Sequence, residues 1–144
     1  MWLTRMGRSF KTIAFSIYAA AFGNGVAVAQ ASEDLVTVFD GKKYTIAYYK
    51  SSVKNLPPEW KKVWILTNRK LEENTTPERI QSIRRNVLFN CVRNTYSTLA
   101  TVNYATPNAA GKPNLQTDTG FELNDDPVPE DTALAIIKSQ ICGT

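Results

Sequence analysis

Five short runs of apolar, aromatic and β-branched residues follow one another from residue 35 onward, and turn-forming residues separate several of them. Such runs are typical of β-strands that bury one face. The runs cover residues 35–39, 44–49, 63–67, 86–92 and 95–104. Consecutive strands with short connections predict an antiparallel meander.

The connections between these runs differ in kind. Asp40-Gly41 and Arg93-Asn94 are short turn signals, so the last two strands form a predicted hairpin. Leu56-Pro57-Pro58 predicts a connection without regular pairing, because proline lacks the N–H of a strand ladder. Residues 105–130, rich in Pro, Gly and Asn, predict a long loop.

Strict alternation along the last two predicted strands predicts two sets of residues that each share a face: Val87, Phe89 and Cys91, and Tyr96, Thr98, Ala100, Val102 and Tyr104.

A helix is predicted over residues 130–141, after Pro127 and Pro129. Acidic residues at its start suit the helix dipole. Leu134, Ile137 and Ile141 form one apolar stripe, and Cys142 follows directly. The predicted fold class is therefore α+β, an antiparallel meander with one face packed by a C-terminal helix.

The first 31 residues have the pattern of a cleaved secretory signal peptide. Three basic residues precede an apolar region over 12–22, too short for a membrane span of about twenty residues. Cleavage after Ala29 and cleavage after Ala31 fit equally well. Residues 32–144 then form one predicted domain. No cysteine follows either cleavage site, so we expect an exported protein that is not a lipoprotein and has no membrane span after cleavage.

Removal of the predicted signal peptide would lower the net charge of the chain. Fourteen basic and thirteen acidic residues remain after residue 31, a net charge of about +1 instead of the +4 of the whole sequence. The basic residues come in doublets, such as Lys61-Lys62 and Arg84-Arg85, which we interpret as solvated strand ends. No sustained basic patch points to nucleic acid.

Cys91 and Cys142 are the two cysteines of the sequence. In an exported chain they predict one disulfide, from the inner face of strand 86–92 to the end of the helix. An intermolecular bridge and two buried thiols are the alternatives.

The residues offer little catalytic chemistry. There is no histidine, and a disulfide would remove both thiol nucleophiles. Neighbouring acids such as Glu72-Glu73 and Asp125-Asp126 do not form a desolvated carboxylate pair. We therefore predict no catalytic residues, no metal site and no cofactor, and a protein that is not an enzyme.

The order of several short motifs resembles the surface-adhesin protein E family, over about residues 35–142. The matching segments are Tyr48-Tyr49-Lys50-Ser51-Ser52-Val53, Lys62-Val63-Trp64-Ile65, Phe89-Asn90-Cys91, Tyr96-Ser97-Thr98-Leu99, Tyr104 with Gly111, and Pro129 through Cys142. This chain has Lys50 where the family usually has Asp, and Phe121 near the position of a common Trp.

The resemblance implies an antiparallel sheet, a helix, a disulfide and a binding role. The prototype of the family is a surface lipoprotein that binds host extracellular-matrix proteins. For this chain we expect an exported envelope protein, periplasmic or secreted in a Gram-negative bacterium, with a protein partner in the envelope or the host matrix. A released or displayed adhesin and a small periplasmic enzyme or enzyme inhibitor are the alternatives.

Aromatic residues are the candidates for a binding surface. Tyrosine and tryptophan form rigid amphipathic contacts at low entropic cost. With the helix on one face of the sheet, the other face is the predicted docking site. The candidate residues are Tyr48, Tyr49, Trp64, Tyr96 and Tyr104.

Overall fold

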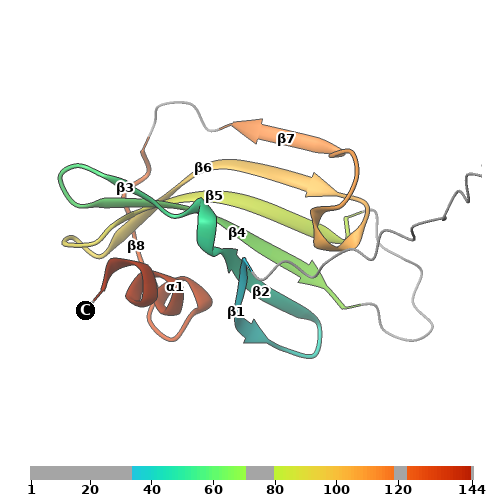
Figure 1. Cartoon of the computed structure of the whole chain (residues 1–144), viewed down its shortest axis with the longest axis horizontal. Coiled ribbons are helices and arrows are strands. Elements are labelled where there is room, and N and C mark those ends of the chain that lie inside the picture. Colours follow the sequence, from blue (N-terminus) through green and yellow to red (C-terminus); the bar gives the residue numbers. More distant parts are fainter. Residues whose placement is uncertain (1–33, 71–79, 119–122, 144) are drawn as a thin grey trace, which may run out of the picture.

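An eight-stranded antiparallel sheet with one C-terminal helix forms the part of the protein that the structure describes (Figure 1). The structure is a computed structural model and describes residues 34–70, 80–118 and 123–143. The predicted signal peptide and Phe121 lie outside the described residues. The strands are β1 (Leu35–Asp40), β2 (Tyr44–Tyr49), β3 (Lys54–Leu56), β4 (Trp60–Arg69), β5 (Ser82–Asn90), β6 (Thr95–Tyr104), β7 (Leu115–Asp118) and β8 (Asp126–Pro127).

The strand order confirms the predicted meander. The sheet runs β1-β2-β4-β5-β6-β7, with β3 paired to β4 and β8 paired to β6. The five predicted strands correspond to β1, β2, β4, β5 and β6. β4 extends beyond the predicted residues 63–67 at both ends. β5 begins four residues before the predicted strand 86–92 and ends two residues before its predicted end, so Cys91 and Val92 lie in the turn.

Two segments that were predicted to be irregular connections contain short strands. β3 precedes Pro57-Pro58 and pairs with the start of β4, so the prolines occupy the turn, where no ladder hydrogen bond is needed. The predicted loop over 105–130 contains β7, β8 and a short 3₁₀ helix, η2 (Pro107–Ala109). All four residues of β7 are exposed, which is why no alternating pattern marked it.

A β-bulge corrects the predicted faces of β6. Val87 pairs with Thr98 and Asn86 pairs with Ala100, so Leu99 is an extra residue between them. Tyr96 therefore lies on the face of the core, whereas Val102 and Tyr104 lie on the opposite face. Strict alternation along the whole strand was wrong.

The helix α1 (Ala133–Cys142) covers one face of the sheet. It begins three residues later than predicted, because Asp131 has a positive φ of 56° and Thr132 caps the helix through its hydroxyl. Ile137 packs into the core between α1 and the sheet. The buried core cluster consists of Tyr48, Val63, Ile65, Val87, Phe89, Val128 and Ile137.

The predicted disulfide joins the end of α1 to the sheet. Cys142 is the last residue of α1 and Cys91 follows β5 directly, and their Cα atoms lie 5.6 Å apart. The bond is intramolecular, so the intermolecular and free-thiol alternatives do not apply here.

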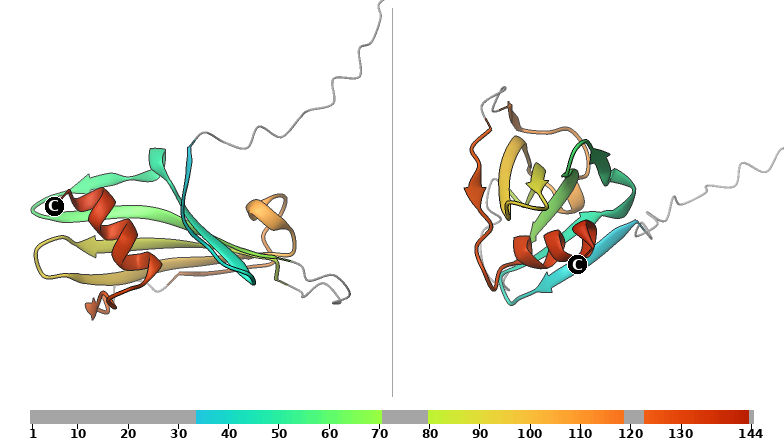
Figure 2. Two further views of the ribbon diagram at one scale, coloured as in Figure 1. Left: turned by 90° about the horizontal axis from the view of Figure 1, so that it is seen from below. Right: turned by 90° about the vertical axis from the view of Figure 1, so that its left-hand side faces the viewer.

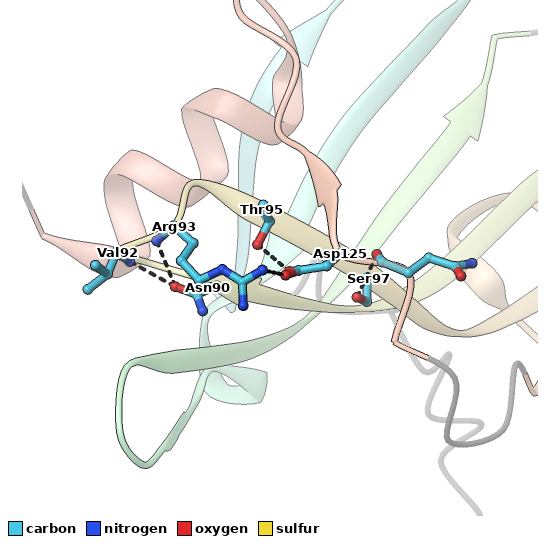
Figure 3. A network of polar contacts seen from close by, with 7 residues as sticks. Asn90, Val92, Arg93, Thr95, Ser97 and Asp125 are labelled. Carbon is cyan, nitrogen blue, oxygen red and sulfur yellow. Dashed lines mark hydrogen bonds and ion pairs between the residues drawn. The ribbon is translucent and has the colours of Figure 1, made fainter.

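Polar contacts hold the segment before α1 against the β5–β6 hairpin (Figure 3). The side-chain oxygen of Asn90 accepts hydrogen bonds from the backbone N–H groups of Val92 and Arg93, which closes the turn. Asp125 accepts hydrogen bonds from Arg93 and Thr95. These contacts place β8 beside β6 and direct the chain toward α1.

The sheet extends beyond α1. The left view of Figure 2 shows α1 crossing one end of the sheet while β4, β5 and β6 continue past it. We call the face of the sheet on which α1 packs the α1 face. One part of this face is buried in the core under α1, and another part is not covered by the helix.

Candidate functional site

The five predicted binding residues lie on two different faces. Tyr48 is 7% exposed and belongs to the core, and Tyr96 packs against that core. Tyr49, Trp64 and Tyr104 lie on the opposite face, which we call the far face. Tyr104 is also only 7% exposed. The structure therefore brings Tyr49 and Trp64 together as half-buried aromatic residues and separates them from Tyr48 and Tyr96.

Arg84 joins these two aromatic residues. Its guanidinium carbon lies 4.9 Å from the centre of the Tyr49 ring and 4.8 Å from that of Trp64. A guanidinium group at this distance is attracted by the electron-rich face of each ring. We call Tyr49, Trp64 and Arg84 the Arg84 cluster. It spans β2, β4 and β5, and Arg84 was not among the predicted residues.

The Arg84-Arg85 doublet is not a solvated strand end. Both residues lie inside β5 and are half-buried. Because neighbouring residues in a strand face opposite ways, Arg84 lies on the far face and Arg85 on the α1 face. One doublet thus places a positive charge on each side of the sheet.

Two polar atoms, one in the Arg84 cluster and one beside it, lack hydrogen-bond partners in the described part of the chain. Arg84 Nε and Asn86 Oδ1 are buried and have no hydrogen-bond partner among the described residues. Within the same ranges Arg84 makes no ion pair. Unpaired buried polar groups cost about 1–3 kcal/mol each, so native proteins contain few of them.

The electrostatics of Tyr49 reflect this environment. Burial raises the pKa of the Tyr49 hydroxyl, while the nearby positive charge of Arg84 lowers it. Asp34 contributes a smaller rise, and its own carboxylate accepts hydrogen bonds from the N–H and hydroxyl of Ser51. Those hydrogen bonds lower the pKa of Asp34.

The far face is partly covered at one end. Ser82 Oγ donates a hydrogen bond to the carbonyl of Thr106 and accepts one from the N–H of Ala109. The side chain of Asn68 exchanges hydrogen bonds with Asn108. The segment around η2 therefore lies over the ends of β4 and β5 and covers this part of the far face.

We expect the pKa of Tyr49 to rise further when Arg84 is replaced by glutamine. The substitution removes the positive charge that lowers this pKa and leaves the burial that raises it. A pH titration of protein labelled with ¹³C at the tyrosine Cζ atoms measures the change. Arg85→Gln, on the other side of β5, is the matched control and should leave this pKa unchanged. A fall in the pKa, or equal rises in both variants, would contradict the placement of Arg84 against Tyr49.

Two hollows lie elsewhere on the described surface. A groove of about 300 Å³ lies on the α1 face, beyond the helix, between β2, β4 and β5. Another hollow of about 450 Å³ lies beside the disulfide, against Trp60 and the Pro57-Pro58 turn. Among the described residues, neither lining contains a pair of acidic side chains.

The described residues contain no group of His, Cys, Asp or Glu that could hold a metal ion. In the same part of the chain, no helix has the length and apolar character needed to cross a bilayer. Both cysteines are in the disulfide.

The comparisons with known proteins agree with this fold. The family model described as surface-adhesin protein E matches residues 35–143. A solved structure of Haemophilus influenzae protein E, in its crystal form II, superimposes with a TM-score of 0.53 and 18% identity over 77% of this chain and 88% of that chain. At this identity the likeness shows the fold alone, and no curated protein sequence matches the chain. Because the family model spans all of the described residues but Asp34, the chain belongs to the surface-adhesin protein E family.

Proposed function

We propose that this protein is an exported, non-enzymatic binding protein of the bacterial envelope, and that the Arg84 cluster on the far face is its contact site for acidic segments of partner proteins. The observation that carries the proposal is the position of Arg84 between Tyr49 and Trp64, without an ion pair among the described residues. Membership of an adhesin family supports a role in binding.

The residue types of the cluster support a protein contact. Tyrosine, tryptophan and arginine are the residues most enriched where binding energy concentrates in protein interfaces. The two rings hold the guanidinium group in place, which lowers the entropy lost when a partner binds. Asn86 adds an amide beside the cluster, since it pairs with Trp64 across β4 and β5.

The charges that β4 and β5 carry on the far face support an acidic partner, and the acidic residues nearest to them lie outside these two strands, at Asp34 and at Asp118 of β7. Lys62 lies on this face with Arg84, since it pairs with Leu88 two positions along β4 from Trp64. The strand positions that face this way in β4 and β5 carry no acidic residue. A carboxylate of the partner would find a planar guanidinium group, which binds carboxylates through paired hydrogen bonds.

Binding of a short peptide that alternates glutamate and threonine tests the proposal. We expect the purified protein to bind this peptide in calorimetry and to bind it more weakly at high salt. Arg84→Gln should lower the affinity by about tenfold or more, since hydrogen bonds to charged groups are among the stronger ones. Trp64→Leu should weaken binding while Arg84 keeps its charge.

Two controls make the test specific. The same peptide with glutamine in place of glutamate should not bind, and Arg85→Gln should bind the acidic peptide like the unsubstituted protein. Equal binding of both peptides, or an equal loss in Arg84→Gln and Arg85→Gln, would count against the far face as an acid-binding site.

The alternative function, a released or displayed adhesin, has a host extracellular-matrix protein as its partner. Solid-phase binding to host extracellular-matrix proteins distinguishes the two, with the reduced, unfolded protein as the control. If matrix proteins bind the folded protein and Arg84→Gln weakens that binding, the partner of the Arg84 cluster is a host protein. If they bind equally well to Arg84→Gln, the cluster is not the contact site.

A further inference from the structure

We propose a second site, independent of the far face: the groove between β2, β4 and β5 binds a small amphipathic carboxylate, a free medium-chain fatty acid. The groove lies on the α1 face, where the strands continue past the helix (Figure 2). Its volume of about 300 Å³ is at the lower end of those that hold small ligands. The lining residues are Tyr44, Ile46, Thr67, Arg69, Ile80, Gln81, Ser82, Ile83 and Arg85.

The apolar part of the lining suits a short acyl chain. Ile46, Ile80 and Ile83 line the groove together with the ring of Tyr44, which is 43% exposed. Phe39 packs against Tyr44 with ring centres 5.4 Å apart and is 40% exposed. These side chains are on the same face as the core but beyond the cover of α1. Burial of apolar surface is the main favourable contribution to binding in such a groove.

The charged part of the lining suits a carboxylate. Arg69 and Arg85 both line the groove, and its lining contains no acidic residue among the parts of the chain that the structure describes. Asp40, at the end of β1, is engaged by Lys70. Within the described ranges Arg85 makes no ion pair, so its guanidinium group has hydrogen-bond donors for a ligand. Charge complementarity therefore favours an anionic head group over a cationic or neutral one.

Thr67 gives the groove an additional polar group. Its hydroxyl oxygen is buried and has no hydrogen-bond partner among the described residues. Rotation about the Cα–Cβ bond exchanges the positions of the hydroxyl and methyl groups. After this rotation the hydroxyl could donate a hydrogen bond to a ligand carboxylate that Arg85 holds in the groove.

Three ligands with the same alkyl chain test this proposal: decanoate, decanol and decylamine. We expect the purified protein to bind decanoate in calorimetry, with decanol at least about tenfold weaker and decylamine weaker still. Binding of decanol as tight as that of decanoate would overturn the role of the arginines. The absence of decanoate binding would overturn the site itself.

Variants on the two faces locate the site. Arg85→Gln should weaken decanoate binding by about tenfold or more, and Arg84→Gln, its neighbour on the far face, should leave it unchanged. Ile83→Trp, which fills the groove, should abolish decanoate binding but not binding of the acidic peptide. Decanoate binding that survives both Arg85→Gln and Ile83→Trp would overturn the proposal, whatever the far face binds.

Discussion

Replacing Cys91 and Cys142 together with alanine should lower the free energy of unfolding by about 4 kcal/mol. The disulfide closes a loop across 51 residues, and the chain-entropy model assigns a stabilisation of this size to a loop of that length. For a domain of this size the loss corresponds to a fall in Tm of roughly 15 °C. Thermal unfolding followed by circular dichroism measures it.

A reducing agent provides the matched control for this prediction. Reduction should lower the Tm of the unsubstituted protein to that of the double variant and leave the double variant unchanged. A double variant that unfolds within a degree or two of the oxidised protein would show that the covalent link between α1 and β5 contributes little to stability.

Truncating Ile137 to alanine should cost about 2–5 kcal/mol of folding free energy. Ile137 is fully buried in the core between α1 and the sheet, so the change removes apolar contacts and leaves a cavity. Because Cys142 remains bonded to Cys91, α1 stays tethered while it loses its central contact. Denaturant unfolding of the oxidised protein measures the change.

The neighbouring residue is the control for this truncation. Ile136 is 41% exposed on the same helix, so Ile136→Ala removes the same atoms from a partly solvated position. We expect a clearly smaller effect there, because alanine is also the better helix former. Equal losses at the two positions would mean that α1 does not pack on the sheet through Ile137.

Local sequence patterns were sufficient to predict much of the fold. Each strand with several apolar or aromatic residues was predicted, as was the C-terminal helix, because alternation and helical spacing are local properties. The disulfide was predicted because a chain with an export signal and two cysteines allows one intramolecular pairing. β7 was missed because its side chains are all exposed and its pairing with β6 depends on tertiary contacts. The start of α1 was misplaced because the positive φ of Asp131 is a feature of the backbone.

The candidate site depended on long-range register, which limits prediction from the sequence. The aromatic character of Tyr49 and Trp64 pointed to a surface, but the bulge at Leu99 decides which tyrosines of β6 share a face. Arg84 enters the site because the pairing of β2, β4 and β5 brings it between two rings. A doublet of arginines contains no signal of that pairing.

A titration of ¹⁵N-labelled protein with the glutamate-threonine peptide, followed by NMR, tests the central claim most directly, since it reports every residue that a ligand touches. We predict chemical-shift changes centred on Tyr49, the indole N–H of Trp64, Arg84 and Asn86, with the groove residues Ile46 and Arg69 unaffected. Changes centred on the groove, or spread evenly over both faces, would contradict the assignment of the Arg84 cluster as the contact site for acidic partners.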